Sequence, residues 1–177
     1  MIIYELNFNY DYAVADVIES LQGADSLELC AERPDLYDSF KYGWLTNESE
    51  IIPDFVIIMS KLIGCRADIS ATIKELIPKQ ELHPIKIEDK DYLLLSYIPI
   101  LSARLNLRKS KITRFSNGDI MDITSPVFLP NDYPILFGIE EMPSSYFCTQ
   151  EFKQMVDSSN YNGLLFEECR IKSKSWF

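Results

Sequence analysis

From residue 85 onward the chain is a series of short runs of β-branched and aromatic residues, each bounded by residues that favour turns. Asn117 and Gly118 stand between two of these runs and are a strong signal for a β-hairpin. The pattern therefore predicts a mostly antiparallel sheet. Its predicted strands are 85–87, 92–98, 111–115, 120–123, 127–129 and 135–139.

Two segments in the first half have apolar residues at helical spacing. The segment 14–21 is predicted to be a short amphipathic helix that stops at Gly23. The segment 69–77 is predicted to be a helix with Asp68 as its N-cap. Pro78 ends this second helix because proline cannot continue the helical hydrogen bonding.

The two ends of the chain complete the predicted fold. Residues 2–8 and 164–166 are predicted strands, and Thr149 is the predicted N-cap of a helix that Asn160 and Gly163 terminate. Short helices at the margins of a mostly antiparallel sheet make an α+β fold. The length of 177 residues and the lack of a Gly/Ser-rich linker predict a single domain.

The net charge of −10 at pH 7 lies entirely in the first third of the chain. Residues 1–55 hold 12 acids and two bases, whereas residues 56–177 hold 15 of each. An acidic surface attracts a basic partner and repels nucleic acid, so we predict no nucleic-acid binding. The alternative is a solvated acidic face that serves only solubility. Within this third, residues 24–52 lack clean periodicity and are predicted to form loops and short elements.

No membrane span or export signal is found in the sequence. The longest apolar run, 55–59, has five residues, far fewer than the ~20 needed to cross a bilayer. The first residues lack the basic, apolar and small-residue regions of a secretory signal. We therefore predict a cytoplasmic protein that does not bind membranes.

The residues that most often carry catalysis are sparse. The closest glycines are 20 positions apart, which excludes the Gly-rich phosphate-binding loops and the G-x-S-x-G nucleophile motif. The cysteines at 30, 65, 148 and 169 form no C-x-x-C pair, and His83 is the single histidine. We predict free buried thiols, no metal, no cofactor and no enzymatic activity. The alternative is an enzyme with an unrecognised site near His83.

One basic segment departs from the acidic total. Residues 104–114 contain five bases and no acid, namely Arg104, Arg108, Lys109, Lys111 and Arg114. Such a segment can contact phosphates, yet it carries no known nucleic-acid motif. Pairing with the acidic first third or with a partner protein is the favoured interpretation.

Several motifs follow one another in a characteristic order from Pro53 onward. They are Ile52 to Phe55, Leu82 to Ile87, Tyr92 to Ile98, Leu105 to Ser110, Phe147 to Phe152 and Tyr161 to Glu168. This order resembles a bacterial immunity-protein family of polymorphic toxin systems, long catalogued as a domain of unknown function. The resemblance covers residues 53–177 and is not extended to the acidic, variable N-terminal residues 1–52. Ala103 and Asn106 stand where the family tends to have acids, and Cys148-Thr149 replaces its usual Val-Ser.

The resemblance implies a role but no catalytic residue. It implies a protein that binds a cognate antibacterial toxin in a stoichiometric complex and so neutralises it. The charge distribution is compatible with that role, because nucleases have positive substrate grooves that an acidic inhibitor can occupy. The alternatives are the enzyme near His83 and a scaffold module that only mediates interactions.

The toxin contact is predicted to lie within residues 25–50. Four acids there are expected to steer a basic toxin, and three aromatic residues are expected to anchor it. The acids are Asp35, Asp38, Glu48 and Glu50, and the aromatic residues are Tyr37, Tyr42 and Trp44.

Overall fold

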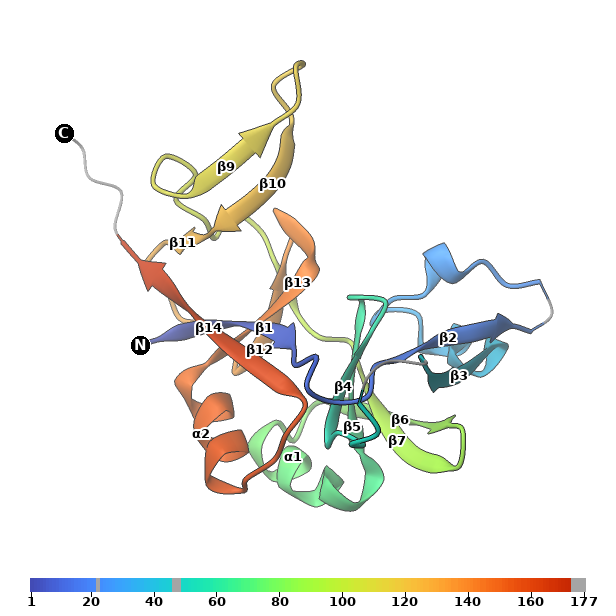
Figure 1. Cartoon of the computed structure of the whole chain (residues 1–177). Coiled ribbons are helices and arrows are strands. Elements are labelled where there is room, and N and C mark those ends of the chain that lie inside the picture. The colour runs from blue at the N-terminus through green and yellow to red at the C-terminus, as the bar shows by residue number, and fades with distance from the viewer. Residues whose placement is uncertain (22, 46–48, 173–177) are drawn as a thin grey trace. The chain divides into compact units, whose positions relative to one another are not determined.

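The computed structural model describes residues 1–21, 23–45 and 49–172 (Figure 1). These residues form two compact units, each with many more contacts within itself than with the other. Unit 1 comprises Met1–Leu6, Pro99–Met155 and the described residues from Phe166 on, and unit 2 comprises Asn7–Ile98 and Val156–Leu165. The prediction of a single domain stays a prediction.

Unit 2 contains a six-stranded sheet in the order β2-β3-β6-β7-β5-β4. All neighbouring strands are antiparallel except β3 and β6. The two outer strands, β2 and β4, also contact each other, so the sheet curls around its core. The strands are β2 (Ala15–Ser20), β3 (Phe40–Trp44), β4 (Phe55–Ile58), β5 (Leu62–Arg66), β6 (Glu81–Ile87) and β7 (Lys90–Ser96).

Short helical segments accompany this sheet. Their bounds are η1 (Ser26–Glu28), η2 (Pro34–Ser39) and η3 (Ala67–Ile69), which are 3-10 helices, and α1 (Ser70–Leu76). The core includes Leu29 and Tyr37 from the 26–39 region together with Val56, Ile87 and Leu94 from the strands. The 3-10 segments are therefore packed elements of unit 2 rather than free loops.

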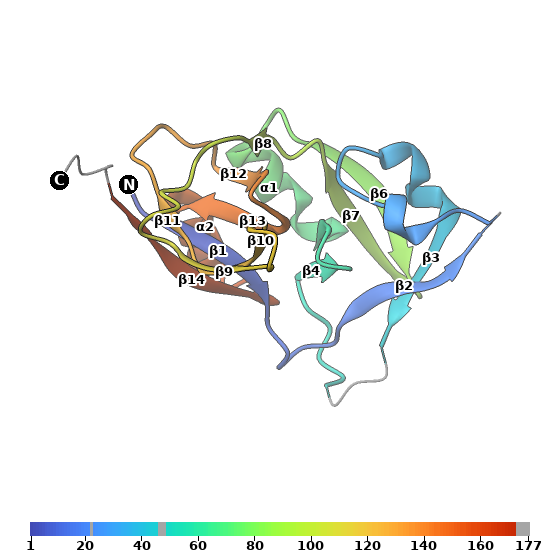
Figure 2. The same ribbon diagram turned by 90° about the horizontal axis from the view of Figure 1, so that it is seen from above.

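Most of the second six-stranded sheet lies in unit 1, and its strand order is β11-β14-β1-β13-β12-β8. The strands are β1 (Ile3–Phe8), β8 (Ile100–Leu101), β11 (Val127–Phe128), β12 (Leu136–Ile139), β13 (Met142–Thr149) and β14 (Leu164–Ile171). Helix α2 (Gln150–Ser158) lies beside β1 and β14 in both views (Figures 1 and 2). The ring of Phe152 on α2 lies 6.5 Å from the ring of Phe166 on β14.

An aromatic cluster fills the core of unit 1. Phe128 packs its ring against those of Tyr133, Phe137 and Phe147, with centroid separations of 5.6, 6.1 and 5.0 Å. Edge-to-face pairs at such distances add to the free energy gained by burying the rings.

A separate hairpin of β9 (Lys111–Arg114) and β10 (Ile120–Ser125) carries some of the basic segment (Figure 1). The predicted hairpin is confirmed, but its loop is longer than two residues. Phe115 N–H donates to Asp119 O, and Gly118 takes a φ of +92° in the turn. The wider prediction of a sheet-rich, mostly antiparallel protein with few short helices is also confirmed. In the described residues no helix is both long and apolar enough to cross a membrane.

The helix predicted over 14–21 is wrong, because Ala15–Ser20 is strand β2 and pairs with β3. Val17 and Ile18 are β-branched and lose side-chain freedom in a helix, whereas a sheet edge accommodates them well. Helical spacing over eight residues could not outweigh the backbone hydrogen bonds that β3 provides.

Both predicted helix caps are also wrong. The Asp68 carboxylate accepts a hydrogen bond from Arg66 Nε at 2.7 Å, and the residue before α1 is Ile69, which makes no side-chain cap. Thr149 does precede α2, but its hydroxyl has no hydrogen-bond partner. The predicted end of the 69–77 helix is confirmed, since α1 stops before Pro78.

Segments 108 residues apart meet in unit 2 at Asp54 and Asn162. Asp54 N–H donates to Asn162 Oδ1 at 3.0 Å, and Asn162 N–H donates to Asp54 Oδ2 at 2.9 Å. Arg66 Nη1 lies 3.2 Å from Asp54 Oδ1. The residue Asp54 is only 6% exposed. A Cβ at Gly163 would overlap Phe55 O, so glycine is required for this approach. We call this contact the 54–162 junction.

Replacing Asp54 with alanine is expected to lower the free energy of unfolding by about 3 kcal/mol, because it leaves the partly buried Asn162 N–H and the Arg66 guanidinium without their acceptor. Asp68→Ala is the matched control, since Asp68 binds the same arginine from an exposed position. Its cost is expected to stay below about 1 kcal/mol because solvent screens an exposed pair. Urea unfolding of both variants measures the difference, and equal costs would contradict the role of the junction.

Candidate functional site

The acidic charge is confined to one unit. Counted over the sequence, unit 2 contains 18 acids and eight bases, whereas unit 1 contains nine of each. The full net charge of −10 therefore belongs to unit 2. A basic partner would be attracted to the surface of this unit.

The segment η1 to η2 carries exposed carboxylates, and one arginine neutralises some of them. Arg33 donates to both carboxylate oxygens of Asp35, with Nη2 to Oδ2 at 2.9 Å and Nε to Oδ1 at 3.0 Å. Its Nη1 also lies 3.9 Å from Glu28 Oε2. Hydrogen bonds from Arg33 lower the pKa of Asp35. Asp35 is thus exposed, as a steering residue must be, but its charge is paired within the segment.

Asp38 is the more available carboxylate. Its side chain is exposed and lies 3.6 Å from Nε2 of His83, which β6 holds half-buried. The His83 ring also packs edge-on against Tyr37 at 5.1 Å between centroids. The histidine is therefore held between a buried tyrosine and a surface carboxylate.

Tyr37 and Tyr42 were predicted to anchor a partner, and their burial corrects that prediction. Tyr37 is 0% exposed, and Tyr42 is also buried in the core of unit 2. Tyr42 Oη donates to Tyr37 O at 3.0 Å, and Tyr37 Oη donates to Cys30 O at 3.3 Å. Rings that already fill the core offer no surface to a partner.

The other predicted contact residues differ in position. Trp44 is half-buried and packs edge-on against Tyr92, with 5.9 Å between centroids. Glu50 is exposed, and Glu48 lies outside the described residues. Of the seven predicted residues, the three acids Asp35, Asp38 and Glu50 are exposed in the described portion of the chain.

Tyr97 is an exposed aromatic residue that the sequence pattern missed. The pattern placed it inside a strand, whereas β7 ends at Ser96 and Tyr97 takes a φ of +56°. Its N–H donates to Ala31 O at 2.8 Å, which places it beside the acidic 26–39 region. Its side chain is 52% exposed. Positive φ is uncommon for a bulky residue, and no local sequence signal indicates it.

Most basic side chains of the segment 104–114 are exposed to solvent, either on β9 or in the residues that precede it. Arg108, Lys109, Lys111 and Arg114 are exposed and form no ion pair with any described residue. Arg104 is half-buried, and its backbone N–H donates to Glu141 Oε1 at 3.1 Å. This segment is a second charged surface, opposite in sign to that of unit 2.

The cysteines are free, as predicted, although Cys30 is only half-buried. Burial raises the pKa of Cys65 and of Cys169 to about 12, so both thiols stay protonated at neutral pH. Among the described residues no group of three or more His, Cys, Asp and Glu side chains could hold a metal ion.

The sequence matches no protein-family model. A search of the curated proteins finds no match either. The resemblance to immunity proteins therefore stays a prediction that rests on the motifs quoted above.

Replacing Tyr37 with alanine is expected to lower the free energy of unfolding by about 3–5 kcal/mol, because the change opens a cavity in the core. The matched control is Tyr97→Ala, which removes an exposed ring and is expected to cost about 0.5 kcal/mol or less. Urea unfolding compares the two variants. Equal costs would show that Tyr97 is also a core residue.

The buried thiols predict a loss of stability in alkali. A group with a raised pKa in the folded state stabilises the fold below its unfolded pKa, which is about 8.5 for cysteine. This contribution is lost as pH rises towards about 12, the folded pKa of Cys65 and Cys169. The free energy of unfolding should therefore fall between about pH 9 and 11, measured by urea unfolding. Cys65→Val, which removes one ionisable group, should make this fall less steep.

Proposed function

We propose that this chain is an immunity protein that neutralises a cognate antibacterial toxin by forming a stoichiometric complex with it, without catalysis of its own. The observation that carries the proposal is the concentration of the whole net charge in unit 2. The toxin is a basic, nuclease-like protein, and both partners act in the cytoplasm. The order of motifs from Pro53 onward, which resembles immunity proteins, supports the same role.

The electrostatic argument favours a protein partner over nucleic acid. A nuclease must present a positive groove to the phosphates of its substrate, and exposed carboxylates can occupy such a groove. Asp38 and Glu50 are exposed and can serve in this way. Charges at the rim of an interface mainly raise the association rate, whereas buried aromatic residues mainly slow dissociation.

Tyr97 replaces the two buried tyrosines as the aromatic anchor of the proposed interface. It is exposed and is hydrogen-bonded through its backbone to Ala31, between the acidic segments η1 and η2. Aromatic residues are enriched at the centre of protein interfaces, whereas carboxylates are found mostly at the rim. Trp44, which is half-buried, can contribute its accessible edge.

The test is a growth assay with the protein that the neighbouring gene encodes, which the proposal predicts to contain a toxin domain. Cells that express this toxin should survive only when the present chain is co-expressed, and the purified proteins should elute as one stoichiometric complex. Lack of protection together with lack of a complex would overturn the proposal. Catalytic turnover that disappears in His83→Gln would favour the alternative enzyme instead, since His83 is held near Asp38.

Charge reversal should separate steering from anchoring. Asp38→Lys combined with Glu50→Lys is expected to slow association with the toxin about tenfold at low salt and to weaken its salt dependence. The matched control is Asp132→Lys with Glu140→Lys, an equal charge change at exposed positions of unit 1. It should leave most of the association rate intact. Stopped-flow kinetics at several salt concentrations measure both variants.

The opposite outcome would move the interface. An unchanged rate in the unit 2 variant, together with a large loss for Arg108→Glu with Lys111→Glu, would place the contact on the basic segment. In that case the toxin would have to be acidic, and the proposed basic nuclease would be wrong.

A further inference from the structure

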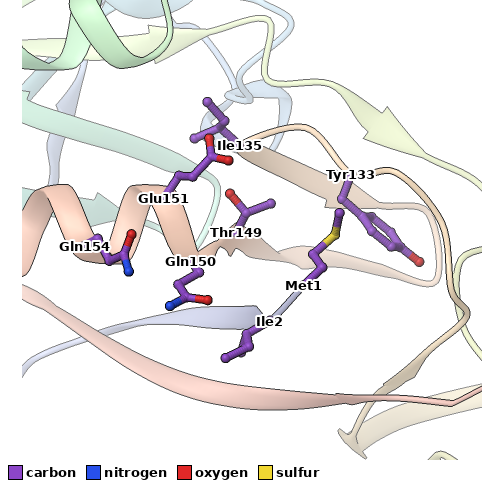
Figure 3. A pocket seen from close by; sticks show the side chains of 8 residues that line it. All are labelled: Met1, Ile2, Tyr133, Ile135, Thr149, Gln150, Glu151 and Gln154. Atoms are coloured by element: carbon purple, nitrogen blue, oxygen red, sulfur yellow. The ribbon is translucent and has the colours of Figure 1, made fainter.

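Unit 1 has two surface features that the proposed toxin contact does not use, a pocket and a group of exposed bases. The pocket opens at the start of α2 and has a volume of about 350 Å³ (Figure 3). Among the described residues that line it, Glu151 has the only charged side chain. The pocket therefore does not attract an acidic surface, whereas the exposed bases do.

Hydrogen bonds fix the turn that carries these bases into β9. Lys109 N–H and Ser110 N–H both donate to Asn106 O at 2.9 Å, and Ser110 Oγ donates to the same oxygen at 3.0 Å. Ser110 Oγ also accepts a hydrogen bond from Val127 N–H at 3.0 Å, which ties the turn to β11. We call residues 107–111 the basic turn.

The basic turn exposes bases together with one large apolar side chain. Arg108, Lys109 and Lys111 are exposed, and none of them forms an ion pair within the described part of the chain. Leu107 is exposed beside them. Because hydrogen bonds already fix the turn, little backbone freedom is lost when it binds a partner. The turn is therefore a preformed docking element for a surface with carboxylates and apolar side chains.

Unit 2 has a surface of this kind where three segments of the chain meet. Ala13 N–H donates to Ile51 O at 2.9 Å, which joins the segment before β2 to the segment before β4. Leu45 N–H donates to Val14 O at 2.8 Å, which joins the end of β3 to the same place. The three segments therefore share one part of the unit 2 surface.

This part of the surface is both apolar and acidic. Tyr10 is 79% exposed, Ile51 is 60% exposed, and Leu45 is exposed as well. Asp11 and Glu50 are exposed acids, and neither forms an ion pair with a residue that the structure describes. We call Tyr10, Asp11, Leu45, Glu50 and Ile51 the acidic strip.

The charges favour a second copy of the chain as the occupant of the acidic strip. The strip belongs to the acidic first third of the sequence, with which the basic segment is expected to pair. The bases of the turn have no acidic partner among the described residues of their own chain. A second copy supplies that partner, because turn and strip are opposite in charge and both expose apolar side chains.

The net charge does not prevent this contact at ordinary salt. Each copy has a net charge of −10, which opposes association at long range. At about 0.15 M salt the screening length is about 8 Å, so charges far from the contact are largely screened. The charges that meet across the contact then dominate, and they are opposite in sign.

We propose that the basic turn of one copy docks on the acidic strip of a second copy. Arg108 and Lys111 pair with Asp11 and Glu50, and Leu107 packs against the apolar side chains of the strip. Because the two surfaces differ, each copy can make the contact once with its turn and once with its strip. The inference goes beyond the proposed toxin binding but shares Glu50 with it, so a bound toxin would compete with the second copy.

Analytical ultracentrifugation of the full chain without toxin tests the proposal, so its failure leaves the proposed toxin binding unaffected. A small contact is expected to have a Kd of about 0.1 mM, so the mean mass should rise above that of a monomer between about 10 and 500 µM protein. A monomer over this whole range would overturn the proposal. A monomer that instead binds DNA through Arg108 and Lys111 would assign the turn to nucleic acid and would also overturn it.

Two charge reversals locate the contact. Arg108→Glu with Lys111→Glu reverses the turn, and Asp11→Lys with Glu50→Lys reverses the strip. Each variant alone should self-associate at least about tenfold more weakly, whereas an equimolar mixture of the two should associate again because opposite charges meet once more. Recovery in the mixture would also show that both variants are folded. Undiminished association of either variant, or no recovery in the mixture, would overturn the assignment.

The matched control is Asp132→Lys with Glu140→Lys, at exposed positions of unit 1 outside the basic turn. It changes the net charge by as much as the strip variant does, and it should self-associate like the unchanged chain. An equal loss in the control would show that net charge alone governs association and would contradict the proposed contact.

Discussion

The reciprocal hydrogen bonds between Asp54 and Asn162 are the constraint on which unit 2 depends. They hold the segment 156–165 against the start of β4, although 108 residues separate the two partners. The Asp54 carboxylate is buried and would be unfavourable without its donors. Arg66 and the backbone of Asn162 supply them. Gly163 allows the two backbones to approach, because any side chain there would meet Phe55.

The junction also involves motifs on which the predicted resemblance to immunity proteins rests. Two of the motifs quoted for that prediction, Ile52 to Phe55 and Tyr161 to Glu168, contain the residues that meet at the 54–162 junction. A third contains Tyr92, whose hydroxyl donates to Pro53 O. These residues hold a fold together. A fold can serve many functions, so the proposed role depends on the surface of unit 2 and has to be tested there.

The two units differ in the kind of binding that they can support. Unit 2 has all of the net charge and exposes carboxylates together with Tyr97, which suits contact with a basic protein. Unit 1 has no net charge and exposes the basic turn, which suits contact with an acidic surface. The toxin and a second copy of the chain would therefore share part of unit 2, where Glu50 belongs to both proposed contacts. The two proposals can still fail separately, because self-association does not require the toxin.

The sequence alone determined the features that depend on neighbouring residues. The β9–β10 hairpin follows from Asn117-Gly118 between two β-forming runs, and α2 follows from apolar spacing bounded by Asn160 and Gly163. Only the tertiary structure decided which aromatic residues are exposed and can therefore contact a binding partner. Tyr37 and Tyr97 look alike in the sequence, yet one fills the core and the other is exposed. Burial depends on strands distant in sequence, and local periodicity does not contain that information.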